Sequence, residues 1–150
     1  MSAFLADGEF VDPQDPSTFE RCRLHWDLMA SDPHSGVLAW YGDCMALRKQ
    51  EASLGNCQKD LVRAECDSLR GWLTMERGDP SGSRTLLLCN FSDAAQAIPV
   101  PFHEAAWHMR LWSGAARYGR PLTEPAALVA GGSSSSVEVA ASGAALFISG

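Results

Sequence analysis

Hydrophobic and polar positions follow two different periods along this chain, and the change comes near residue 59. Before that point, residues 17–29 and 33–50 carry apolar side chains at helical spacing. After it, short runs alternate or stay apolar in the way that strands do. The expected strands are residues 61–66, 70–77, 84–91, 97–101, 108–113, 136–140 and 144–149. The pattern therefore predicts an α+β chain, with N-terminal loop and helices followed by an antiparallel all-β sandwich.

The two expected helices have recognisable start signals. Ser17 and Glu20 have the spacing of a capping box, which predicts a helix from residue 17. Ser31 or Asp32, followed by Pro33, predicts the start of the helix over 33–50. One broad face of this second helix is apolar and consists of Val37, Trp40, Tyr41, Cys44, Met45 and Leu47.

Turn residues indicate how the strands connect. Residues 78–82 separate two strands with the chemistry of a hairpin, and we predict a second hairpin around residues 142–143. The run Leu86-Leu87-Leu88 is typical of a strand that is buried on both sides. Two prolines, Pro99 and Pro101, confine their strand to an edge. Residues 114–135 are rich in Gly, Pro and Ser and are expected to form a long loop.

Length and composition narrow the classes of function that this chain can have. With 150 residues the chain is too short for a (β/α)₈ barrel, which needs about 250. The net charge of −6 and the scattered arginines exclude a phosphate-binding stripe, so no nucleic acid is expected as a partner. No run is long enough for a membrane span and no secretion signal is present, so we expect a cytoplasmic protein with no membrane contact.

Neither a metal site nor another cofactor is expected. The odd number of cysteines, five, includes no C-x-x-C pair, which favours reduced thiols over disulfides or zinc. The histidines lack any metal-ligand spacing. They are His25, His34, His103 and His108.

One segment resembles a known enzyme family. The stretch DPQDPSTFERCRLHW, residues 12–26, is similar to a segment near the end of the catalytic barrel in malto-oligosyltrehalose trehalohydrolases, members of the α-amylase family of glycoside hydrolases. HSGVLAWYGDCMALRK resembles the last helix of such a barrel. LLLCNFS and the later LWSG resemble the β-domain that follows it. The three segments agree with the family in order and spacing.

The resemblance implies a domain organisation and a chemistry. Residues 1–52 would be the end of a barrel, and residues 53–150 the C-terminal β-sandwich domain. The family hydrolyses an α-1,4 bond of maltooligosyl-trehalose and releases trehalose, in a pathway that starts from glycogen or maltodextrin. Its retaining mechanism uses two carboxyl groups about 5 Å apart. No position of this chain matches the motifs of those groups, so we assign no catalytic residue and expect no hydrolysis by the chain alone.

The resemblance also implies a partner. The apolar face of helix 33–50 would cover a barrel sheet that this chain does not contain. We therefore expect it to dock on the β domain, on a second copy of the chain or on a separately encoded barrel.

Candidate sugar-binding residues have ordinary alternatives. Asp12, Gln14 and Asp15 would lie on the loop that opens on the catalytic face, where they are candidates for a maltooligosaccharide subsite. The alternative is that these side chains only build turns. Three tryptophans, Trp72, Trp107 and Trp112, are candidates for a stacking platform, as an independent carbohydrate-binding module would need, with Trp107 expected to be the most exposed. The alternative is a place in the core.

A carboxylate pair is a further candidate. Glu65 with Glu76, or Asp67 with Glu76, would face each other across neighbouring strands as an acid and a base. The commoner arrangement is that such carboxylates are solvated on an exposed strand face.

Overall fold

The computed structural model describes residues 12–100, 106–126 and 136–149, and within them the chain is α+β as predicted. Helical elements come first: α1 (Pro16–Arg21), the 3₁₀ turn η1 (Trp26–Ala30), α2 (His34–Gln50), α3 (Ala52–Gly55) and η2 (Lys59–Leu61). The strands follow: β1 (Val62–Asp67), β2 (Trp72–Gly78), β3 (Arg84–Asn90), β4 (Gln96–Pro99), β5 (His108–Trp112), β6 (Ser136–Val139) and β7 (Ala144–Ser149), with η3 (Ala116–Tyr118) after β5.

The first expected helix is wrong in its start and its length. Asp15, not Ser17, is the N-cap, because its Oδ1 accepts the Ser17 amide at 2.7 Å while Pro16 occupies the first helical position. The helix ends at Arg21, and η1 replaces its expected second half. The second helix, α2, agrees with its predicted range to within one residue.

Five strands form one antiparallel sheet in the order β1-β2-β3-β7-β5. The predicted hairpin between β2 and β3 is confirmed. Its turn is closed by the Asp79 amide, which donates to the Ser83 carbonyl at 2.9 Å, and Gly82 supplies a φ of +96°. In β3 the side chains of Leu86 and Leu88 are fully buried and Leu87, on the opposite face, is half-buried.

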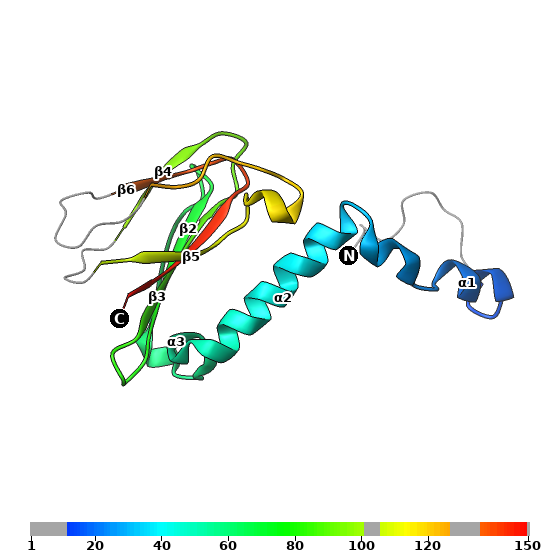
Figure 1. The fold of residues 1–150 in the computed structure, drawn as a ribbon, viewed down its shortest axis with the longest axis horizontal. Coiled ribbons are helices and arrows are strands. Elements are labelled where there is room, and N and C mark those ends of the chain that lie inside the picture. Colours follow the sequence, from blue (N-terminus) through cyan, green and yellow to red (C-terminus); the bar gives the residue numbers. More distant parts are fainter. Residues whose placement is uncertain (1–11, 101–105, 127–135, 150) are drawn as a thin grey trace.

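Strands β4 and β6 form a separate two-stranded sheet that packs against β2 and β3 (Figure 1). Alternate residues of both sheets meet in one apolar core, as the period of two requires. Its buried members are Trp72, Leu86, Leu88, Ile98, Trp107, Trp112, Val137, Val139, Ala145 and Phe147. The two layers are unequal, so β1 extends past the smaller sheet. Of the strand expected over 97–101, Pro101 lies outside the described residues.

The predicted hairpin between β6 and β7 is wrong. Both edges of β7 already pair, one with β3 and the other with β5, so β6 pairs with β4 in the other sheet. The chain between them crosses from one layer to the other. Gly143 makes this corner possible, because a Cβ there would lie 2.7 Å from the Trp112 ring and 2.8 Å from the Ala140 carbonyl oxygen.

Helix α2 runs away from the large sheet and carries η1 and α1 beyond it (Figure 1). Its C-terminal end contacts α3, and its N-terminal half contacts η3. α1 therefore lies at the opposite end of the molecule from the two sheets (Figure 1).

Candidate functional site

The loop at residues 12–15 is exposed, and its two carboxylates accept hydrogen bonds from nearby backbone amides. Asp12 Oδ1 accepts the Gln14 amide at 2.9 Å, and the Asp12 carbonyl accepts the Thr18 hydroxyl at 2.8 Å. The hydrogen bond from the Ser17 backbone lowers the pKa of Asp15. These bonds are those of the turn-building alternative. A sugar subsite at Asp12, Gln14 and Asp15 stays a prediction.

The expected exposure of Trp107 is wrong. Its side chain is only 5% exposed and belongs to the core cluster, as do Trp72 and Trp112. The indoles fill the space between two sheets, and no stacking face of the required size is presented to solvent at these three positions. β5, the strand that follows Trp107, lies far from α1, which the loop at residues 12–15 precedes (Figure 1).

Of the four histidines, His103 lies outside the described residues, and His25, His34 and His108 are exposed. Within the described ranges, no three His, Cys, Asp or Glu side chains gather where they could hold a metal ion. The five cysteines, all of them in described segments, are free.

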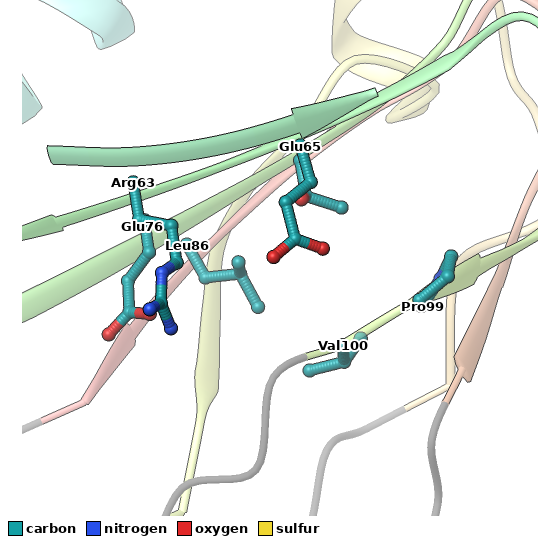
Figure 2. Close-up of a pocket in the computed structure, with 7 residues that line it drawn as sticks. Arg63, Glu65, Glu76, Leu86, Pro99 and Val100 are labelled. Atoms are coloured by element: carbon teal, nitrogen blue, oxygen red, sulfur yellow. The ribbon is translucent and has the colours of Figure 1, made fainter. Parts of the chain in front are cut away.

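A cleft lies where β1 extends past the smaller sheet, and Figure 2 shows its side chains. Glu65 and Arg63 point into it from β1, and Glu76 from β2, while Pro99 and Val100 form the opposite wall. The antiparallel register sets this arrangement, because Arg63 is directly opposite Glu76 and Glu65 is opposite Thr74. Leu86 forms an apolar floor. The cleft has a volume of about 120 Å³.

A second cavity of about 310 Å³ adjoins the first and shares Arg63 and Glu76 with it. Here Arg84 Nη1 donates to Glu76 Oε1 at 2.6 Å, and the Glu76 side chain is 15% exposed. A charge-assisted bond of this length orients the carboxylate. We call the two cavities together the β1–β4 cleft. It is a groove of mixed charge beside an apolar floor.

The sequence anticipated part of this cleft and missed the rest. Glu65 and Glu76 were candidates as a pair across strands, and the structure brings them to one cavity. Asp67 does not line it; its Oδ1 accepts the amides of Leu69 and Arg70 instead. Pro99 ends β4 in the other sheet and Val100 follows it, and no local pattern indicates that contact. The hint in the sequence was the alternation of charged residues with apolar ones in β1.

A second notable surface lies on the outer side of α2. The expected apolar face of the helix divides, because Trp40 turns towards η3, where its ring meets Tyr118 edge-on at 5.1 Å. The outer residues stay between 51% and 63% exposed. They are Val37, Leu38, Tyr41 and Met45, which we call the α2 stripe. Further exposed apolar side chains, in α1, in η1 and between them, are Phe19, Trp26 and Leu24, each about 70% exposed.

No helix in the described part of the chain combines the length and the apolar character needed to cross a membrane.

Comparisons with known proteins agree with the resemblance seen in the sequence. No family model matches the chain. It is 34% identical over 95 residues to a malto-oligosyltrehalose trehalohydrolase of Mycobacterium tuberculosis, a match that covers 63% of this chain and 16% of the relative. A trehalohydrolase of Arthrobacter ramosus is 37% identical over 67 residues, covering 45% of this chain and 11% of the relative. A trehalohydrolase of Brevibacterium helvolum is 34% identical over 83 residues, covering 55% of this chain and 13% of the relative. The chain thus matches about a sixth or less of the length of these relatives.

Proposed function

We propose that this chain is the C-terminal, non-catalytic part of a glycoside hydrolase similar to malto-oligosyltrehalose trehalohydrolase, which acts in trehalose biosynthesis from maltodextrin or glycogen. Residues 1–52 are then the end of the barrel, and residues 53–150 the C-terminal β-domain. The observation that carries the proposal is the 34% identity over 95 residues to the Mycobacterium tuberculosis enzyme. We propose that the protein is cytoplasmic, together with the sugar substrates of the enzyme.

The α2 stripe supplies a physical role. Large apolar side chains that are contiguous and more than half exposed are typical of a surface that another protein covers. Its occupant, we propose, is the catalytic barrel, because the relatives contain a large part that this chain does not match and the stripe lies on the helix that resembles the barrel's last one. In this role the chain stabilises a barrel that carries the catalytic carboxylates.

The test is reconstitution. The Mycobacterium tuberculosis trehalohydrolase without its matching segment is mixed with this chain, and co-elution and trehalose release are measured. We expect a complex, and we expect the double substitution Tyr41→Ser with Met45→Ser to abolish it. Leu69→Ser is the matched control, since Leu69 is 98% exposed in a turn of the β domain.

The relative's own excised segment, added back, serves as the positive control. If that segment restores the complex and this chain does not, the role of the α2 stripe is refuted. Sedimentation of the chain alone tests the competing occupant, since a stable dimer that the double substitution dissociates would make a second copy the partner.

A second candidate function is an independent carbohydrate-binding or subunit-stabilising module. It is favoured by the β1–β4 cleft rather than by the buried tryptophans.

Within the first function, we propose separately that Asp12, Gln14 and Asp15 form part of a maltooligosaccharide subsite on the barrel. Gln14→Ala in the reconstituted complex should then raise the KM for the oligosaccharide without lowering kcat. An unchanged KM would leave these residues with turn-building alone.

A further inference from the structure

We propose that the β1–β4 cleft binds one end of a neutral sugar, with one ring partly entering the cavity between Glu65 and Val100. This inference deepens the second candidate function by naming its site and its ligand class. It is argued from the side chains of the cleft and does not depend on the proposed role of the α2 stripe.

The charges of the cleft favour an uncharged ligand. Two guanidinium groups, Arg63 and Arg84, are interleaved with the carboxylates of Asp60, Glu65 and Glu76 along the two cavities. Two positive charges against three negative charges leave a net of −1. Because both signs line the same cavities, a charged ligand of either sign would lie beside like charges as well as opposite ones.

A hydroxyl group suits both kinds of side chain. It donates to a carboxylate and accepts from a guanidinium, so neighbouring hydroxyls of one ring use Glu65 and Arg63 together. Thr74 on β2, opposite Glu65, lines the same cavity. A neutral molecule that carries several adjacent hydroxyls therefore matches this lining better than a charged one.

The remaining walls suit the carbon skeleton of a ring. Pro99, the last residue of β4, and Val100, which follows it, form an apolar wall, and Leu86 lies fully buried at the floor. Binding sites for small molecules usually combine such apolar walls with a few placed polar groups. The apolar CH face of a sugar ring would lie against Pro99 and Val100 while its edge reaches the charged side chains on β1 and β2. Figure 2 shows these side chains on opposite sides of the cavity.

The dimensions limit the ligand. A cavity of about 120 Å³ equals roughly four water molecules at about 30 Å³ each, so one ring enters it only in part. The adjoining cavity of about 310 Å³ continues past Arg63 towards Asp60 and leaves room for a second ring. Glu76 is held at their junction by Arg84, which orients its carboxylate before any ligand arrives. A disaccharide is therefore the smallest ligand that occupies both cavities.

The experiment is a titration of the whole chain, followed by the backbone amide resonances. Maltose and trehalose are the neutral probes, and glucosamine and glucuronate are the cationic and anionic ones. We expect the neutral disaccharides to shift the amides of residues 63–65 and 74–76. Glu65→Gln and Arg63→Gln should each weaken binding about tenfold, because each removes a charge-assisted hydrogen bond.

Glu138→Gln is the matched control, since Glu138 is exposed on β6 in the other sheet. Its binding should equal that of the unaltered chain. Unfolding curves of all three variants separate lost binding from lost folding. The proposal is overturned if glucosamine or glucuronate binds more tightly than maltose, if no amide in these segments shifts, or if folded Glu65→Gln binds as well as the control. Reconstitution of a complex is a separate measurement, so its failure leaves this result intact.

Discussion

The Tyr118 hydroxyl donates a hydrogen bond of 2.6 Å to Oδ2 of Asp43, a residue 75 positions earlier in the chain. The same carboxylate oxygen forms an ion pair with Arg117 at 2.5 Å. Asp43 lies on α2, and both partners belong to η3 in the loop after β5. Together with the edge-on packing of Trp40, this contact joins the middle of α2 to the β domain. The placement of the α2 stripe depends on it.

Tyr118→Phe should lower the free energy of unfolding by about 1 kcal/mol, the usual net worth of one intramolecular hydrogen bond. Asp43 keeps its ion pair with Arg117, so the loss is limited to one bond. Denaturant unfolding of both proteins measures it. Tyr41→Phe is the control, because Tyr41 is 63% exposed and its loss of a hydroxyl should change little. Equal effects of the two substitutions would contradict the importance of this contact.

Stability should also fall at alkaline pH through the same tyrosine. Burial, followed by the hydrogen bond to Asp43, raises the pKa of Tyr118 to about 12. In the unfolded chain a tyrosine loses its proton near pH 10, so between about pH 10 and about pH 12 the unfolded state binds fewer protons than the folded one. The contribution is complete below that window and is lost as the pH rises through it. Unfolding curves near pH 9 and near pH 11 should therefore differ less for Tyr118→Phe than for the unaltered chain.

Two glycines of α2 should respond in opposite directions to the same substitution. A Cβ at Gly36 would overlap the backbone carbonyl oxygen of Tyr118, so Gly36→Ala should separate α2 from η3 and lower stability. Gly42 has nothing within 4 Å of such a Cβ. Gly42→Ala should therefore stabilise the chain by about 1 kcal/mol through helix propensity alone. Thermal unfolding of the two variants measures both effects, and a stabilising Gly36→Ala would refute the close approach.

Asn90 should be among the costliest polar residues to replace. It is 2% exposed, and its Nδ2 donates to the carbonyl oxygens of Ala94, Val139 and Ala140 at 2.8 to 3.0 Å. Asn90→Ala leaves buried carbonyls without this donor and should lower the free energy of unfolding by about 3 kcal/mol. Ser92→Ala, which removes a partner of Asn90 Oδ1, should cost only about 1 kcal/mol. Denaturant titration distinguishes the two values.

The chain alone should release no trehalose from maltooligosyl-trehalose, even though Glu65 and Glu76 share a cleft. Glu65 is exposed on an edge strand and Glu76 is engaged by Arg84. A retaining hydrolase needs two carboxyl groups free to act on one sugar, and Glu76 is already held by Arg84. A trehalose-release assay with the purified chain, beside an intact trehalohydrolase, measures this. Turnover that Glu65→Gln abolishes would show that the cleft is an active site.

Local physics explains why so much of the fold could be predicted. Strand β7 occupies the predicted range without error, and α2 differs from its range by one residue. Burial on one face imposes a period of two on a strand and about 3.6 on a helix, so each element leaves its pattern in its own residues. The capping error at Ser17 arose because Asp15 and Pro16 form a stronger local start signal than the capping box.

The pairing of these elements was decided by the tertiary structure alone. The residues between β6 and β7 have the turn pattern of a hairpin. β6 nevertheless pairs with β4, because β3 and β5 occupy both edges of β7. The burial of Trp107 and the meeting of Glu65 with Val100 likewise depend on which sheet covers which. The amino-acid sequence by itself determined where the helices and strands lie and which family the chain resembles. Competition among distant strands for hydrogen-bonding edges and apolar faces determined the cleft, because that competition involves residues with no local relation to one another.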